Sequence, residues 1–227
     1  MIEIGKIISY WEMCNNEGAS LQRGMNYKLK GRHSVILMSL RPNAPYADRI
    51  EDDGRVLIYE GHDAPYGPEN KPKLIDQPMY TGSNLSQNGF FYNAAMEYKK
   101  HNKKTELVRV YEKIRSGIWV YNGLFKLVDA WQEDSNNRKV FKFRLELTEE
   151  KENETEHIDL EHTRLIPSAV KLEVWKRDKG CCVKCGNTNN LHFDHILPFS
   201  KGGTSLTAVN IQLLCARHNL QKHDKIQ

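Results

Sequence analysis

The feature that most constrains this chain is a pair of metal-ligand half-sites near its C-terminus. Cys182 and Cys185 form the first half-site, and Cys215 and His218 form the second, each with two intervening residues. Zinc takes four nitrogen or sulfur ligands in a tetrahedron, and this spacing lets one tight turn direct two of them at the same ion. We therefore expect a structural zinc that closes this segment into one unit, with Cys181 as the alternative ligand to Cys182.

Cysteine and charge are both concentrated in the tail. Cys14 is the only cysteine before residue 181, and such clustering favours a metal site over disulfides. Residues 168–227 contain nine Lys or Arg and only four Asp or Glu, in a chain of net charge +4. This block predicts contact with a polyanion, made mainly by the tail, although a solvated lysine-rich face is the alternative. With neither an 18-residue apolar run nor a secretory signal pattern, we expect a cytoplasmic protein without membrane contact.

The residues before the tail predict a β-rich body of α+β class. Short β-branched or aromatic runs bounded by turn residues indicate strands, and one helix is expected at 86–100 with Ser86 as its N-cap. The run 148–161 has seven acidic residues and one lysine, which predicts a solvated linker. We therefore predict two domains, 1–147 and 167–227, joined by an acidic linker at 148–166. The expected strands are 34–40, 55–61, 106–114, 123–131 and 139–147.

The tail also carries residues suited to phosphodiester hydrolysis. A helix is expected at 168–178 with Ser168 as N-cap, followed by a strand at 191–198 and a last helix at 213–224. Hydrolysis needs a base that activates water and a cation that neutralises the developing oxyanion. His195 suits the first role, and Asp194 supplies a hard oxygen ligand for the second. A bend before Pro198 is expected to let both side chains reach one phosphate.

The tail resembles the HNH nuclease family, with its ββα-metal fold. The resemblance lies in the order W-x-R-D-x-G-x-C-V-x-C-G, D-H-I-x-P, G-G, N-x-Q-x-L-C-x-x-H-N-x-x-K across residues 168–227. It implies His195 as general base, with Asn210 orienting His195 and its loop. Asp194 and Asn219 would then bind a catalytic Mg²⁺ or Mn²⁺, with His223 as the rival to Asn219, and Lys222 is a possible DNA contact. The alternative is a zinc-ribbon-like DNA-binding tail in which His195 only packs.

One loop–strand junction of the body has the composition of a pocket for a planar base. Tyr46 and Tyr59 flank an acid-rich stretch that contains Asp48. Two aromatic rings can sandwich a base, and a carboxylate can accept a hydrogen bond from an exocyclic amine. From the spacing alone, an Asp-rich turn beside ordinary core tyrosines is the favoured interpretation.

The order of motifs in the body resembles the SRA (YDG) domain family. It is carried by SVILMS, Y-x-D, DDG-x4-YEGHD, DQ, VRV, Y-x-G-L-F-x-L-V-x-x-W and K-F-x-L within residues 5–147. The resemblance implies a curved β-barrel with flanking helices that extrudes 5-methylcytosine or 5-hydroxymethylcytosine from duplex DNA. Tyr46 and Tyr59 would stack on the base, and Asp48, or alternatively Asp52 or Asp53, would read its amine edge. Possible contacts to the DNA are Arg32, His33 and Arg49.

Together the two resemblances predict a modification-dependent restriction endonuclease of type IV-like character. Its partner would be double-stranded DNA with modified cytosine. Because one HNH site cuts one strand, a double-strand break implies a homodimer or two copies at one target. The alternatives are a modified-DNA-binding protein whose HNH fold is structural or only nicks weakly, and a nuclease for unmodified DNA of homing or repair type.

Overall fold

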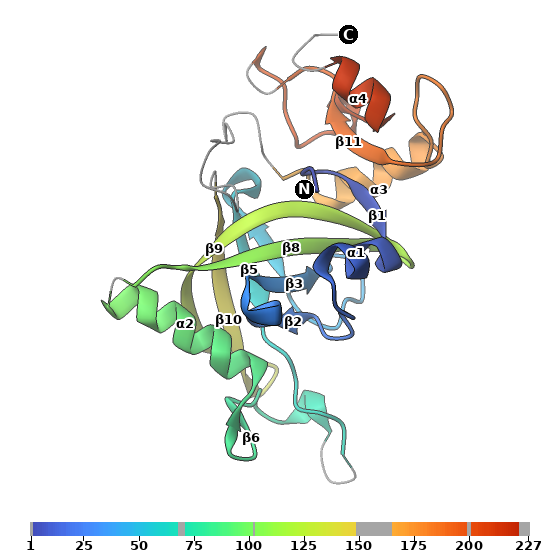
Figure 1. Cartoon of the computed structure of the whole chain (residues 1–227). Helices are drawn as coiled ribbons and strands as arrows, with labels where there is room; N and C mark the ends of the chain where they lie inside the picture. Colours follow the sequence, from blue (N-terminus) through green and yellow to red (C-terminus); the bar gives the residue numbers. More distant parts are fainter. Residues whose placement is uncertain (1, 68–70, 102, 149–164, 199–200, 223–227) are drawn as a thin grey trace.

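The computed structural model describes residues 2–67, 71–101, 103–148, 165–198 and 201–222. It has the expected α+β class, with a curved sheet flanked by helices and a smaller C-terminal unit. Figure 1 shows this unit, coloured orange to red, beside the N-terminal strand and at the opposite end of the molecule from β6. None of the helices in the described ranges is long and apolar enough to cross a membrane.

A mixed eight-stranded sheet forms the body, in the order β2-β3-β8-β9-β10-β5-β4 with β1 paired to β9. Only β3 and β8 run parallel, and the remaining neighbours are antiparallel. The central strand β9 is 18 residues long and pairs with β8, β10 and β1. The strands are β1 (Ile7–Ser9), β2 (Met25–Asn26), β3 (Ser34–Met38), β4 (Arg49–Glu51), β5 (Val56–Glu60), β8 (Glu106–Arg115), β9 (Ile118–Ser135) and β10 (Arg138–Leu147). A separate hairpin is formed by β6 (Tyr80–Thr81) and β7 (Asn84–Leu85).

Alternation along β10 sets one face of the body's core. Phe141, Phe143 and Leu145 are buried in the main apolar cluster, as their spacing predicts for a strand with one covered face. The opposite face is polar only in part. Arg144 is half-buried, whereas Lys142 is 2% exposed and donates to Glu60 Oε2 at 2.9 Å. In the first half of β10 the Glu60 carboxylate therefore takes the place of water as the partner of the Lys142 ammonium group.

The helix expected at 86–100 is present as α2 (Gln87–His101). Ser86 Oγ accepts a hydrogen bond from the Gly89 N–H at 3.2 Å, as an N-cap does, and Phe91 and Ala95 are buried in the core. Figure 1 shows α2 lying across β9 and β10.

A second helix of the body, α1 (Tyr10–Glu17), was not expected from the sequence. Its capping box is complete, because the Glu12 N–H bonds Ser9 Oγ at 3.2 Å while Glu12 Oε2 accepts from the Ser9 N–H at 2.8 Å. The Ser-x-x-Glu spacing at 9–12 is the sequence signature of this start. The β-branched residues directly before Ser9 favour a strand, and the helical periodicity begins only after Ser9.

The C-terminal unit has the ββα arrangement. It consists of α3 (Ser168–Arg177), β11 (Leu191–His195), the 3₁₀ turn η5 (Ala208–Asn210), β12 (Ile211–Cys215) and α4 (Ala216–Lys222). Two expectations were wrong here. Ser168 is the first helical residue rather than the N-cap, and its hydroxyl donates to buried Glu112 of β8. The last helix begins at Ala216 because residues 211–215 pair with β11 as a strand.

The predicted acidic linker falls almost entirely on residues 149–164, outside the described part of the chain. The residues that follow are buried at once. Leu165 is 3% exposed and packs in the core of the body, while Ile166 is 6% exposed and joins the cluster around α3. The chain therefore enters the C-terminal unit along an apolar surface.

We predict that Phe143→Ala destabilises the body strongly, because Phe143 is 0% exposed, stacks on Phe141 and contacts Phe91 edge to face. Deletion of a buried phenyl ring costs about 3–5 kcal/mol of unfolding free energy. Urea unfolding measured by circular dichroism checks this value. The control Leu74→Ala, at a residue 70% exposed, should change stability by less than about 0.5 kcal/mol, and equal effects would contradict the assignment of the core.

Candidate functional site

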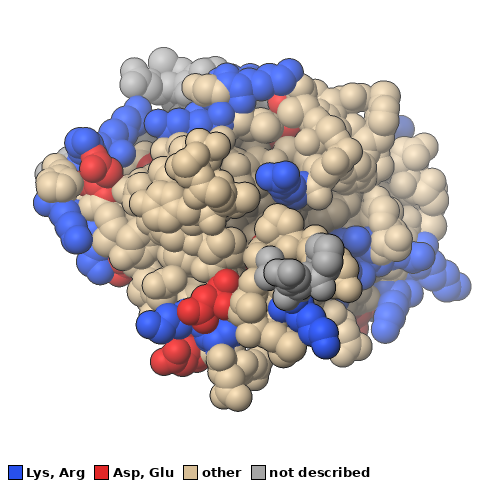
Figure 2. Space-filling model, turned by 90° about the horizontal axis from the view of Figure 1, so that it is seen from below, with Lys and Arg blue, Asp and Glu red and all other residues tan. Residues whose placement is uncertain are grey.

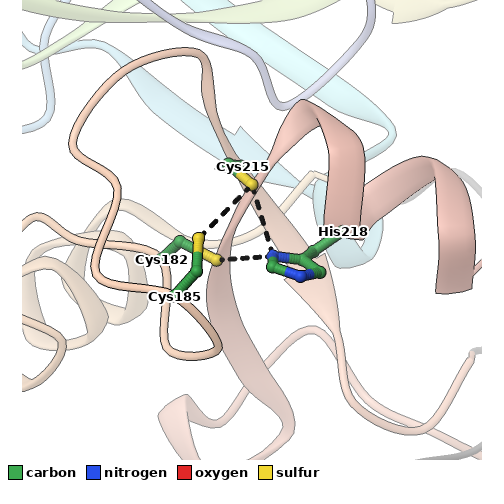
Figure 3. Close-up of side chains that lie close together, drawn as sticks. All are labelled: Cys182, Cys185, Cys215 and His218. Atoms are coloured by element: carbon green, nitrogen blue, oxygen red, sulfur yellow. Dashed lines mark hydrogen bonds between the residues drawn. The ribbon is translucent and has the colours of Figure 1, made fainter.

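The four predicted zinc ligands converge in the C-terminal unit. Figure 3 shows Cys182 and Cys185 on one loop, Cys215 at the end of β12 and His218 on α4, with their ligand atoms turned toward one another. Nδ1 of His218 lies 3.3 Å from Cys182 Sγ and 3.4 Å from Cys215 Sγ, and the Cys185 and Cys215 sulfurs are 3.9 Å apart. Ligand atoms of a tetrahedral zinc site stand roughly 3.5–3.8 Å apart, from bonds of about 2.0–2.3 Å. The donor set and its spacing therefore fit zinc.

Local electrostatics favour Cys182 as a thiolate ligand. Burial opposes its ionisation, but main-chain N–H groups near Cys215, Lys184 and Cys185, together with His218, lower the pKa of Cys182 to about 6. The neighbouring Cys181 is not among the four clustered ligands, and its thiol faces the Lys179 carbonyl oxygen at 3.3 Å. The geometry thus selects Cys182 over the alternative Cys181.

Asp194 is held by a cation rather than standing open to solvent. Lys222 Nζ lies 2.6 Å from Asp194 Oδ2, and Gln212 Nε2 donates to the same oxygen at 3.2 Å. Lys222 also donates to the His195 carbonyl oxygen and is 1% exposed. The Lys222 ammonium group is therefore used inside the site, and the contact of Lys222 with DNA stays a prediction.

His195 faces the loop that follows β11. Its Nε2 lies 2.8 Å from Ser205 Oγ, and Ser205 is itself buried. Burial lowers the pKa of His195, against the opposing charge of Asp194 and together with the repulsion from Lys222. The imidazole is consequently neutral at neutral pH, which is the state a general base needs.

Asn210 holds the chain that follows His195. Its Oδ1 accepts from the Leu197 N–H at 2.8 Å, and its Nδ2 donates to the carbonyl oxygens of Leu197 at 3.0 Å and Thr204 at 2.9 Å. Gly203 lies against this turn, where a Cβ would stand 1.9 Å from the Leu197 carbonyl oxygen. Asn210 therefore links Leu197 to Thr204, and the next residue, Ser205, contacts His195.

The second predicted ligand of the catalytic metal, Asn219, is half-buried on α4. It precedes Lys222 by three residues, so both project from the same side of the helix, and Lys222 reaches Asp194. A carboxylate and an amide oxygen are hard donors that suit Mg²⁺ or Mn²⁺. The rival ligand His223 lies outside the described residues.

The predicted base-binding residues border a cavity of about 520 Å³ on the body. Tyr46 and Asp48 lie on its wall, and an adjoining polar cavity of about 570 Å³ shares both residues. The wall is completed by the beginning of α1, the β8–β9 turn and β3, with the side chains Tyr10, Leu37, Arg41, His62, Lys113 and Trp119.

Tyr59, expected as the second stacking ring, lies beneath this cavity instead. It is 1% exposed, and its hydroxyl lies 2.9 Å from His62 Nε2. His62 stacks on Tyr46 with ring centres 4.9 Å apart and an angle of 6° between the rings. A base between two rings needs about 7 Å, from two contacts of about 3.5 Å each. A base can therefore enter between Tyr46 and His62 only if these rings separate.

Asp48 is oriented by the main chain. The N–H groups of Glu60 and Ser39 donate to its two carboxylate oxygens at 3.0 and 3.3 Å. Burial outweighs these bonds and raises the pKa of Asp48 to about 7, with the nearby Glu60 charge adding to the effect. The pocket thus holds a carboxyl group that titrates near neutral pH. Of the alternatives, Asp52 is exposed in the 3₁₀ turn η2 (Asp52–Gly54), and the Asp53 side chain is outside the described parts.

The three remaining predicted DNA contacts occupy different environments. Arg32 and Arg49 are exposed, and Arg49 Nε bonds Glu51 Oε1 at 2.7 Å. His33 instead contacts buried Glu17 at 2.8 Å, which gives it a structural role in the body. Figure 2 shows Lys and Arg side chains around the edge of the face turned away from the C-terminal unit. The body therefore also presents basic side chains, in addition to the basic tail that the sequence predicts as the main contact with a polyanion.

Two side chains of these sites were not identified from the sequence. His62 is not among the predicted pocket residues, although its place three residues after Tyr59 in the strand-end run Tyr-Glu-Gly-His-Asp is a usable signal. Ser205 follows the Gly-Gly turn by two residues and carries no motif of its own, so only the folded loop brings it to His195.

We predict that Cys215→Ser removes bound zinc and lowers the thermal unfolding temperature, because three ligands rarely retain a structural zinc against competition. Metal analysis of the purified protein by atomic emission should give one zinc per wild-type chain and none per variant chain. Cys14→Ser is the control, since this cysteine lies outside the cluster, and should retain the metal. Undiminished zinc in Cys215→Ser would contradict the ligand assignment.

Comparisons with known proteins give weak overall structural likeness. The SRA domain of SUVH5 bound to fully hydroxymethylated CG DNA has a TM-score of 0.45 and 26% identity, covering 70% of this chain and 94% of that one. The modification-dependent TagI restriction endonuclease has a TM-score of 0.44 and 21% identity, covering 96% and 76%.

Sequence similarity is more informative. The histone-lysine N-methyltransferase family member SUVH2 of Arabidopsis thaliana is 30% identical over 150 residues, which are 63% of this chain and 22% of that protein. The SAD/SRA domain model matches residues 1–151, and the HNH endonuclease model matches residues 182–225. The chain therefore belongs to the SAD/SRA domain family and carries a C-terminal HNH endonuclease domain.

Proposed function

We propose that this chain is a modification-dependent DNA endonuclease. Its SRA part extrudes and reads 5-methylcytosine or 5-hydroxymethylcytosine in double-stranded DNA, and its HNH part hydrolyses a phosphodiester bond nearby. The observation that carries the proposal is the presence, in one chain, of an aromatic pocket containing Asp48 and a ββα unit containing Asp194 and His195. The pocket alone would indicate a binding module, and the ββα unit alone would indicate an unselective nuclease.

The pocket supplies the two interactions that an extruded cytosine requires. Tyr46 offers a ring for stacking, and His62 offers a second one whose orientation is fixed by the Tyr59 hydroxyl. Asp48 offers a carboxylate to the exocyclic amine, with both oxygens already aligned by main-chain N–H groups. Since the amine is a donor, binding favours the ionised form of Asp48.

The HNH site supplies a base positioned by its neighbours. Ser205 engages Nε2 of His195, which leaves Nδ1 to take a proton from the attacking water. Asn210 holds the loop that carries this arrangement. A Mg²⁺ or Mn²⁺ ion held by Asp194 and Asn219 would stabilise the negative charge that develops on the phosphate. The Cys/His zinc cluster has no open position and would keep the ββα unit folded.

One observation favours a second candidate, a modified-DNA-binding protein whose HNH fold is structural or nicks weakly. Lys222 already neutralises Asp194 at 2.6 Å, so a divalent cation must compete with a buried ammonium group. We place this candidate second because His195, Ser205 and Asn210 retain an arrangement that a purely structural unit does not require.

Cutting of both strands adds a requirement on assembly. One HNH site hydrolyses one phosphodiester bond, so a double-strand break needs two copies at one target. A homodimer is therefore part of the proposal for double-strand cleavage, whereas a monomer would produce nicks.

We predict that His195→Ala and Asp48→Ala separate the two activities. His195→Ala should bind a 5-methylcytosine duplex as the wild type does but cut it at least about 100-fold more slowly, the contribution expected of a general base. Asp48→Ala should lose about tenfold or more of its preference for modified over unmodified duplex, since the base amine loses its partner. Gel shifts and cleavage of end-labelled duplexes measure both effects.

His101→Ala and Asp134→Ala, at exposed positions of α2 and β9, are the matched controls. Wild-type binding without cleavage under either metal would favour the second candidate. A different outcome would favour a nuclease for unmodified DNA: both the wild type and Asp48→Ala would then cut modified and unmodified duplexes at the same rate.

We predict an acid limb in the pH profile of cleavage with a midpoint below about 6.5, the ordinary histidine pKa. Burial lowers the pKa of His195, so the neutral base persists to lower pH and the rate falls only when the imidazole is protonated. Initial cleavage rates between pH 5 and 8 under saturating DNA measure the limb. A midpoint at or above 7 would contradict the role of His195 as base.

A further inference from the structure

The strand that carries the HNH residues is joined to the edge of the SRA sheet. The Phe193 N–H donates to the Gly5 carbonyl oxygen at 3.2 Å, and Lys6 forms a β-bridge with His192. Gly5 has a φ of +81°, and a Cβ there would lie 3.1 Å from the Phe193 carbonyl oxygen. Glycine at this position therefore permits the close backbone contact between the two parts.

The two parts also share an apolar core. Ile7, Ile114 and Val120 of the SRA sheet are buried in one cluster with residues of the C-terminal unit. Interfaces between domains allow relative motion by default unless they are large and hydrophobic. Separation here would expose side chains that are between 0 and 9% exposed, so the docked arrangement is favoured. The C-terminal members of the cluster are Ile166, Val170, Val174, Cys182, Leu191, Phe193, Ala208, Ile211, Leu213, Leu214 and Cys215.

A buried ion pair across this interface fixes the position of α3 on the sheet. Glu112 of β8 is 0% exposed, and Lys171 of α3 is 2% exposed, with Lys171 Nζ 2.6 Å from Glu112 Oε2. Asn122 bonds both partners, at 2.9 Å to Glu112 and 2.8 Å to Lys171, and the Ser168 hydroxyl donates to Glu112. Undocking would remove the cation from a carboxylate buried in the sheet, and an unpaired buried charge is strongly unfavourable. The pair thus fixes where α3 sits on the body.

The base pocket is attached to the same elements. Trp119 lies on the pocket wall and pairs with Ile8 of β1, while Val120, next in sequence, packs in the shared core. Lys6, directly before β1, forms the bridge to the strand of Asp194 and His195. Figure 1 shows β1 lying between β9 and the C-terminal unit. Pocket and HNH site are therefore held at a set separation through β1 and α3.

We propose that this docked interface, rather than the length of residues 149–164, sets the distance between the modified base and the cut. Glu112 and Lys171 are positioning residues for cleavage. The inference rests on the proposed function, because it concerns where that function places the break. A free chain of the sixteen residues 149–164 would have a reach of about 20 Å, from about 5 Å per square root of residue number. That reach corresponds to roughly six base pairs at 3.4 Å each.

The test compares a longer connection with a broken ion pair. Ten Gly/Ser residues are inserted after residue 156 in one variant, and Lys171→Met removes the cation in another. Each cuts a linear duplex with one 5-methylcytosine, labelled at both 5′ ends, and break positions are read at nucleotide resolution. We expect the insertion to leave the wild-type positions unchanged and Lys171→Met to spread them over roughly six further base pairs. Lys176→Met, at an exposed lysine of the same helix, is the control and should match the wild type.

Positions that spread with the insertion while the ion pair is intact would overturn the docking inference and leave the proposed function standing. Absence of cleavage by the wild type would overturn the proposed function instead. In that case small-angle X-ray scattering decides the docking without activity. The inference requires a larger maximum dimension for Lys171→Met than for Lys176→Met, and equal dimensions would contradict it.

Discussion

Hydrogen bonding along β9 is the constraint on which the rest of the structure depends. This strand of 18 residues pairs with β10 and β8 along its length and with β1 at its beginning. Trp119, near the beginning of this strand, lines the cavity that contains Tyr46 and Asp48. The next residue, Val120, packs in the apolar core shared with the HNH unit. The register in which β9 pairs with its neighbours therefore determines the positions of the other strands, of the pocket wall and of the surface on which the nuclease domain packs. Errors in this register would move all three together.

Three carboxylates of the body differ in the groups that hold them. Glu112 with Lys171, and Glu60 with Lys142, are ion pairs sealed from solvent at 2.6 and 2.9 Å. Asp48 differs, because main-chain N–H groups orient it without a cation in contact, and its pKa rises to about 7. The first two fix packing, whereas Asp48 keeps an acceptor near its titration point beside an aromatic ring. Under the proposed function, that contrast distinguishes the carboxyl group that reads the modified base from the two that only stabilise packing.

Local patterns in the sequence were enough to predict the metal cluster and the longer strands of the body, because spacing determines both. The four ligands, in two pairs at x2 spacing, converge as expected, and each of the five strands predicted for the body is present. Features set by distant contacts escaped prediction. The position of His62 three residues after Tyr59 is a signal in the sequence, but it does not tell that His62 rather than Tyr59 stacks on Tyr46, because this depends on the burial of Tyr59 in the folded protein. Likewise, Lys222 and Asp194 are far apart in sequence and meet only because α4 packs on β11.

The central claim is that the SRA pocket decides which DNA the HNH site cuts. Its most direct test is a competition in one tube between two plasmids of different length, one carrying 5-methylcytosine and the other unmodified, at equal concentration with Mg²⁺ or Mn²⁺. We predict that the modified plasmid is nicked or linearised while its unmodified competitor remains supercoiled. Cleavage of both plasmids at the same rate would contradict it.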